Sequence, residues 1–96
     1  AQYATLSHLA SLGPGRGLMD LYARVDALGR PVLLIWGRED KTVPFADNVT
    51  LRQAMPHAEF HAIDAAGHLP HIEQPKVVGP AVLRFLVAID LWLAVP

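Results

Sequence analysis

Two short motifs carry side chains that could act together as an acid and a base. Asp40 lies in the polar segment that follows the apolar run ending at Trp36, and His68 follows Gly67 a few residues after a second strand-like run. A carboxylate that accepts a hydrogen bond from an imidazole N–H fixes the tautomer of the ring and stabilises the imidazolium formed when the ring takes a proton. The pair therefore predicts nucleophilic catalysis in which His68 is the base and Asp40 orients it.

A nucleophile for this pair is not evident in the sequence. The serines are Ser7 and Ser11, and neither has the flanking glycines of a Gly-x-Ser-x-Gly elbow. The sequence contains no cysteine. We therefore expect the chain to be a fragment whose nucleophile (serine, cysteine or aspartate) lies elsewhere.

Composition restricts the possible functions. A chain of 96 residues fits one small domain, and its 52% hydrophobic residues are more than one small core easily buries, so we expect some apolar surface to contact a partner. The formal net charge of −1 argues against binding to nucleic acid or to an anionic membrane. The apolar stretch 85–96 is shorter than the about 20 residues that a bilayer span needs. The absence of cysteine is compatible with a reducing compartment, and we expect a cytoplasmic location.

Apolar periodicity predicts the first elements of the fold. One helix is expected within the first dozen residues, before Gly13, and a second is expected from Leu18 until Gly29, because apolar residues recur at helical spacing in both segments. The run from Val32 to Trp36 contains five consecutive apolar residues. We expect it to form a strand covered on both faces.

The next segments complete a strand-helix-strand unit and add a last helix. Residues 45–55 are expected to be helical, and residues 58–63 are expected to form a half-exposed edge strand. The last helix should begin at Pro75, with Pro80 in its first turn or at a kink. A strand-helix-strand connection makes the two strands parallel and brings their carboxyl ends to the same edge, where open α/β sheets bind ligands. Asp40 and His68 are thus expected to meet there.

Three motifs along the chain resemble the carboxyl-terminal part of the α/β-hydrolase fold, in particular its esterase, lipase-like and carbon–carbon hydrolase branches. They are the run from Pro31 to Pro44, the turn from Met55 to Ala58, and the segment from Gly67 to Pro75. The resemblance extends over residues 30–86, a little over half of the chain. It implies Asp40 as the acid and His68 as the base of a catalytic triad.

The resemblance also implies the fold class and the organisation of the chain. The fold class would be α/β, the carboxyl-terminal βαβα portion of an α/β-hydrolase fold, with parallel strands flanked by helices and an incomplete sheet. Residues 1–29 would be a helical segment returning from the cap or lid region, and residues 30–96 the carboxyl-terminal hydrolase segment. The earlier strands, the nucleophile elbow and one loop of the oxyanion hole would be missing, so the missing amino-terminal part of the hydrolase is an expected partner.

The implied activity is hydrolysis of an ester, amide or carbon–carbon bond in a small-molecule substrate, by a serine-type hydrolase without a cofactor. Because the nucleophile is absent, we expect the 96-residue chain alone to have no significant activity. Some branches place the acid after an earlier strand, which would leave Asp40 with a structural role, and Glu39 and Asp47 are competing carboxylates. Candidates for lining the substrate pocket are Trp36, Phe45, Leu69 and His71.

Two further features have simpler interpretations. The side chains of His57, His61, His68, His71 and Asp64 could supply zinc ligands, but His57 and His61 precede and occupy a strand rather than successive turns of one helix, so we expect no metal site. Glu73 is expected to have a structural role, accepting hydrogen bonds around the histidine loop or capping the last helix.

A second class of function is a noncatalytic interaction module. The strand from Val32 to Trp36 would have an unpaired apolar edge in a truncated sheet, and such an edge is a template for association. This alternative predicts self-association of the isolated chain.

Overall fold

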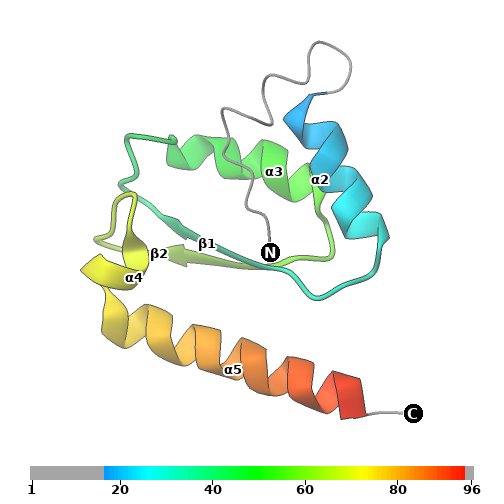
Figure 1. The fold of residues 1–96 in the computed structure, drawn as a ribbon. Coiled ribbons are helices and arrows are strands. Elements are labelled where there is room, and N and C mark those ends of the chain that lie inside the picture. Colours follow the sequence, from blue (N-terminus) through cyan, green and yellow to red (C-terminus); the bar gives the residue numbers. More distant parts are fainter. Residues whose placement is uncertain (1–16, 95–96) are drawn as a thin grey trace.

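Helices lie on both sides of a small parallel sheet in the computed structural model, which describes residues 17–94 (Figure 1). The elements in chain order are α2 (Leu18–Ala27), β1 (Leu33–Gly37), the 3₁₀ helix η1 (Phe45–Asp47), α3 (Asn48–Ala54), β2 (Glu59–Ile63), α4 (Pro70–Glu73) and α5 (Pro75–Ala94). In Figure 1, α2 and α3 lie above the sheet and α5 lies below it. The helix expected within the first dozen residues lies outside the described residues.

The two strands confirm the predicted parallel unit. β1 and β2 pair in parallel, with Leu33 opposite Glu59 and Gly37 opposite Ile63. Each strand begins one residue later than the sequence predicts. The connection between them contains η1 and α3, so both strands end at the same edge of the sheet.

The expectation that the first strand is covered on both faces was wrong. Residues 33–36 are only partly buried, and Gly37 is the buried residue of β1. Within the described part of the chain, β1 has one strand neighbour, so no further strand shields its other edge.

The main apolar core lies between the sheet and α5. Ile63, Ala66 and Val78 are buried there, and Ile35 and Val82 pack against them. None of the large side chains in the described residues falls below 2% exposure, which indicates a thin core. The sheet edge that carries the two motifs therefore rests on a few small contacts rather than on a deep interior.

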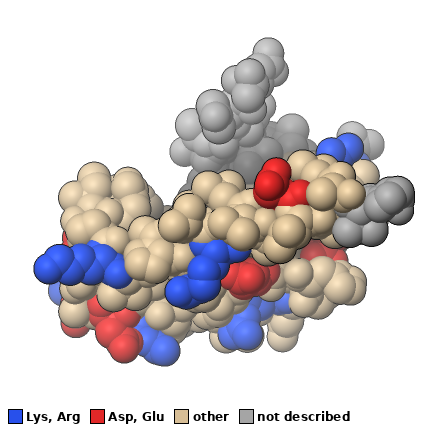
Figure 2. Space-filling model, turned by 90° about the horizontal axis from the view of Figure 1, so that it is seen from below, with Lys and Arg blue, Asp and Glu red and all other residues tan. Residues whose placement is uncertain are grey.

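α5 is one continuous helix of 20 residues that includes Pro80. Pro80 lies beyond the first turn, where proline removes one backbone hydrogen bond, yet the helix continues to Ala94. By length and composition alone α5 could cross a membrane, so the short length of 85–96 does not exclude a span. Seen from the α5 side, the surface shows scattered charges of both signs between large uncharged areas (Figure 2), and Leu83, Val87 and Leu91 are exposed on it.

A polar contact ties α2 to the start of β2. The Asp26 carboxylate accepts a hydrogen bond from the His57 backbone N–H at 3.1 Å, and its second oxygen lies 2.8 Å from His57 Nδ1. The hydrogen bond from the His57 ring is the main reason why the pKa of Asp26 is below its usual value. This contact fixes the end of α2 relative to the sheet.

Candidate functional site

The loop after β1 holds the acid in a fixed orientation. Asp40 is 8% exposed, and its Oδ1 accepts hydrogen bonds from the backbone N–H groups of Thr42 at 2.9 Å and Val43 at 3.0 Å. An aspartate often closes a loop in this way because its short side chain reaches the backbone two or three residues ahead. Trp36 Nε1 donates to the carbonyl oxygen of Val43 at 3.1 Å and closes the far end of the loop.

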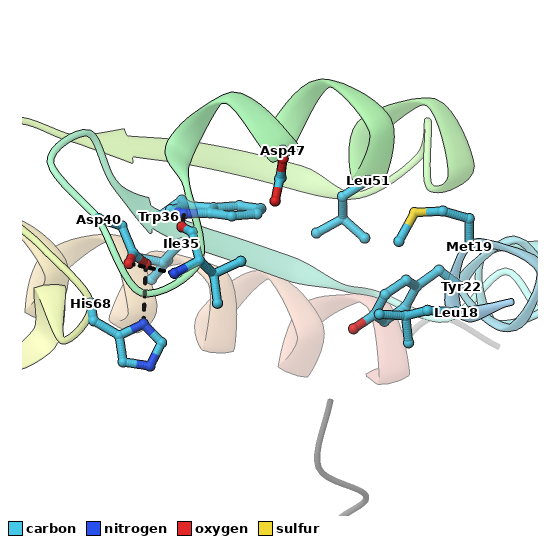
Figure 3. Close-up of a pocket in the computed structure, with 10 residues that line it drawn as sticks. Leu18, Met19, Tyr22, Ile35, Trp36, Asp40, Asp47, Leu51 and His68 are labelled. Atoms are coloured by element: carbon cyan, nitrogen blue, oxygen red, sulfur yellow. Dashed lines mark hydrogen bonds and ion pairs between the residues drawn. The ribbon is translucent and has the colours of Figure 1, made fainter. Parts of the chain in front are cut away.

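The second carboxylate oxygen of Asp40 faces the imidazole of His68. The distance from Asp40 Oδ2 to His68 Nδ1 is 3.1 Å, within hydrogen-bond range (Figure 3). The other ring nitrogen points away from Asp40. The His68 side chain is 50% exposed, whereas that of Asp40 is 6% exposed. The ring is therefore held on one side and accessible on the other.

The environment of Asp40 favours its charged form. Burial alone would raise the pKa of Asp40. Hydrogen bonds from the Val43 N–H, from His68 and from the Thr42 N–H lower it by more than burial raises it, so the pKa lies below its usual value. Asp40 is therefore a carboxylate at neutral pH. A carboxylate is the form that can accept the Nδ1 proton of His68 and stabilise an imidazolium.

The histidine loop is held from the next helix. Glu73 Oε2 in α4 accepts hydrogen bonds from the backbone N–H groups on either side of the histidine, those of Gly67 at 2.9 Å and Leu69 at 3.1 Å. The expected structural role of Glu73 is confirmed, although the short helix α4 that carries it was not predicted. Gln74 Nε2 donates to the carbonyl oxygen of Ala65 at 3.0 Å, and Ala65 has a positive φ of 53°.

The loop that carries Asp40 (residues 38–44, the acid loop) and the loop that carries His68 (residues 64–69, the histidine loop) are in direct backbone contact. The N–H of Glu39 donates to the carbonyl oxygen of Ala66 at 2.9 Å. At Gly37, a Cβ atom would lie 2.1 Å from the carbonyl oxygen of Gly67 and 2.3 Å from that of Ala66. Only glycine fits this approach, so Gly37 is what allows the two loops to lie close enough for the contact between Asp40 and His68.

A cavity of about 420 Å³ opens beside the pair. The carboxylates of Asp40 and Asp47 and the imidazole of His68 line it, and β1 contributes Ile35 and Trp36. The wall farthest from His68 comes from α2, through Leu18, Met19 and Tyr22 (Figure 3). Val43 and Leu51 complete the lining.

One of the four predicted pocket residues, Trp36, lines this cavity. Phe45 instead packs edge-on against Trp36, with 6.5 Å between the ring centroids. Leu69 is 46% exposed and His71 is exposed on α4, and neither lines the cavity. Sequence reasoning missed the α2 residues, because their apolar stripe indicates a face that packs on something but does not show that it borders a cavity.

Three of the four histidines in residues 17–94 form separate pairs with carboxylates. His57 contacts Asp26, His61 contacts Glu59 and His68 contacts Asp40. Within residues 17–94, no group of three or more histidine, aspartate or glutamate side chains could hold a metal ion. Of the three carboxylates considered as the acid, Asp40 contacts His68, whereas Glu39 is exposed and Asp47 lines the cavity.

Comparison with known proteins relates the chain to hydrolases. A family model described as the alpha/beta hydrolase fold matches residues 2–75. The chain is 35% identical over 83 residues to a pimeloyl-acyl-carrier-protein methyl ester esterase of Xanthomonas campestris, with 83% of this chain and 33% of that protein covered. It is 30% identical over 106 residues to a 2-hydroxymuconate semialdehyde hydrolase of Pseudomonas putida, with 93% and 38% covered.

A third similar protein is a 2-hydroxy-6-oxononadienedioate/2-hydroxy-6-oxononatrienedioate hydrolase of Paraburkholderia phymatum. It is 35% identical over 63 residues, which cover 66% of this chain and 22% of that protein. The chain thus spans well under half of the length of the curated relatives that it matches.

Proposed function

The chain belongs to the alpha/beta hydrolase fold family, and on this premise we propose that it supplies the acid and the base of a serine-type hydrolase. The proposal rests on one observation: Asp40 Oδ2 lies 3.1 Å from His68 Nδ1 at the edge where both strands end. We further propose that the chain corresponds to the carboxyl-terminal segment of the hydrolase and that the nucleophile comes from a segment outside these 96 residues.

In this mechanism the Nδ1–H of His68 donates to Asp40, which leaves Nε2 with a free lone pair. The hydroxyl oxygen of the nucleophilic serine attacks the carbonyl carbon of the substrate while Nε2 takes the hydroxyl proton. Asp40 stabilises the imidazolium that forms. The same proton then passes from Nε2 to the leaving group as the scissile bond breaks. A water molecule, deprotonated by His68 in turn, releases the acyl group and restores the nucleophile.

The substrates we propose contain an ester, an amide or an activated carbon–carbon bond. The relatives support this range, because one is named as a methyl ester esterase and two are named as hydrolases. The acyl-transfer chemistry is common to all three bond types, so the acid and base pair does not distinguish between them.

The test uses the full-length protein and a fluorophosphonate probe that labels activated serines. We expect labelling at a serine upstream of this segment and its loss in His68→Ala, whereas His71→Ala, a matched exposed histidine, should label normally. Labelling that persists in His68→Ala would refute the proposed base. Ester turnover by the pure 96-residue chain that is lost in His68→Ala would refute the external nucleophile.

A second candidate function is association through the sheet edge. β1 pairs with β2 on one side, and within residues 17–94 its other edge has no strand partner, which makes it a template for a further strand. We propose that the isolated chain self-associates in this way. Sedimentation at micromolar concentration should show dimers or larger species, and a folded monomer would contradict this second proposal.

A further inference from the structure

We propose that the cavity beside Asp40 and His68 selects an uncharged, apolar acyl group and that α2 sets the length of the group it accepts. This inference deepens the proposed function, because it names the substrate class of the same site. It rests on the composition of the cavity wall and on where the wall charges lie.

The wall around the cavity is apolar over most of its extent. Trp36 and Ile35 from β1, Leu51 from α3, and Leu18 and Met19 from α2 contribute hydrocarbon or aromatic surface. At about 420 Å³, the cavity lies within the range of small-molecule sites. An apolar chain extending from His68 toward α2 would therefore replace water against apolar side chains over most of its length.

The charges on the wall are negative. Asp40 and Asp47 are carboxylates, and within the described residues no lysine or arginine lines the cavity. Asp40 is already occupied by His68 and two backbone N–H groups. Asp47 is exposed and has no ion pair with a described residue, so its charge, although screened by solvent, is not neutralised by a described side chain. A substrate carboxylate would lose hydration and meet a like charge without gaining a lysine or arginine partner among the described residues.

The far wall limits how long the group can be. Leu18, Met19 and Tyr22 line the side of the cavity opposite His68, and the hydroxyl group of Tyr22 points into the cavity (Figure 3). Burial raises the pKa of Tyr22, so the hydroxyl is uncharged at neutral pH and adds no cation to the wall. α2 is anchored to the sheet by the contact between Asp26 and His57. The length limit is therefore built on a fixed element.

Binding to the ¹⁵N-labelled 96-residue chain tests the inference without any turnover. Methyl hexanoate and hexanoate differ in charge but little in size, and the indole N–H of Trp36 reports occupation of the cavity. At pH 7 we expect methyl hexanoate to shift the Trp36 signal and to bind about fivefold or more tightly than hexanoate. Equal or tighter binding of hexanoate would overturn the inference.

Two pairs of variants sharpen the test. Asp47→Asn should reduce the preference for the ester at least about twofold, whereas Asp90→Asn on α5 should leave it unchanged. Met19→Trp should fill the cavity and weaken ester binding about tenfold, whereas Val25→Trp on the exposed part of the same helix should not. Circular dichroism identifies any variant that fails to fold. If Met19→Trp does not fold, the change in ester preference in Asp47→Asn decides whether the inference holds. Unchanged preference in Asp47→Asn would overturn the role of this charge.

The result separates this inference from the proposed function. If the full-length protein loses hydrolysis in His68→Ala but its segment binds hexanoate as well as the ester, the selection of uncharged groups is refuted and the catalytic proposal stands. If the ester binds selectively at Trp36 but His68→Ala hydrolyses at the normal rate, the catalytic proposal is refuted and the selection stands.

Discussion

The acid loop and the histidine loop lie in backbone contact but are built in opposite ways. The acid is itself held: Asp40 is buried, and Thr42 and Val43 donate to its carboxylate. The backbone around His68 is held by Glu73, which accepts hydrogen bonds from the amides of Gly67 and Leu69. The imidazole itself contacts Asp40 on one side and stays half exposed. The comparison teaches that a small segment can provide a fixed charge and an accessible imidazole with one close loop contact.

The largest effect is expected when the charge of Asp40 is removed and the shape of its side chain is kept. In the full-length protein, Asp40→Asn should lower kcat about 10⁴-fold, because an amide presented to Nδ1 favours the imidazole tautomer whose lone pair faces away from the nucleophile. Glu39→Gln, which changes the neighbouring exposed carboxylate, is the control and should retain activity. A loss of less than tenfold in Asp40→Asn would mean that another carboxylate serves as the acid.

The close contact of the loops can be broken at Gly37. Gly37→Ala places a Cβ against the carbonyl oxygens of Ala66 and Gly67, so the loops must separate, and we expect a loss of about 3 kcal/mol in the free energy of unfolding. Gly79→Ala has no neighbour near its added Cβ and should be neutral or stabilising by up to about 1 kcal/mol. Urea unfolding monitored by circular dichroism measures both. Equal stability of the two variants would show that the loops do not depend on the glycine.

The indirect support of the base can be tested at Glu73. In the full-length protein, Glu73→Ala should lower kcat about tenfold with little change in KM, because the ring of His68 becomes less well placed. Glu73→Gln keeps an oxygen that can accept the two N–H groups and should recover most of the rate. If Glu73→Ala lowers the stability but leaves kcat unchanged, Glu73 supports the loop without positioning the base.

The fixed charge also predicts a pH dependence of stability. The pKa of folded Asp40 lies below its ordinary value of 3.8. Its contribution to stability should therefore be complete above about pH 5 and be lost as the pH falls below 4 and through the lower folded pKa. The difference in unfolding free energy between the natural chain and Asp40→Asn should accordingly narrow as the pH falls below 4. A constant difference between pH 6 and pH 3 would contradict this.

The part of the fold that could be predicted from the sequence is the part set by local pattern. The apolar run before Gly37 and the run before Asp64 specified two strands, and the helical crossover between them made the strands parallel. Since both chemical motifs follow strand ends, the meeting of Asp40 and His68 could be expected without coordinates.

The remaining features depend on packing that a local pattern does not contain. α4 has four residues, fewer than the periodicity of a helix needs to be recognised. The stripe of α2 predicted a helix but not the cavity that it borders, since that depends on where α2 lies relative to β1. The close approach at Gly37 likewise arises only when the two loops are brought together.

The most direct test of the central claim is the tautomer of His68 in the ¹⁵N-labelled 96-residue chain at a pH where the ring is neutral. Long-range ¹H–¹⁵N correlations distinguish a proton on Nδ1 from one on Nε2, and the exposed His71 gives the reference in the same spectrum. We predict that His68 carries its proton on Nδ1, facing Asp40, and that Asp40→Asn removes this preference. A proton on Nε2 of His68 in the natural chain, as in an unconstrained histidine, would contradict the account.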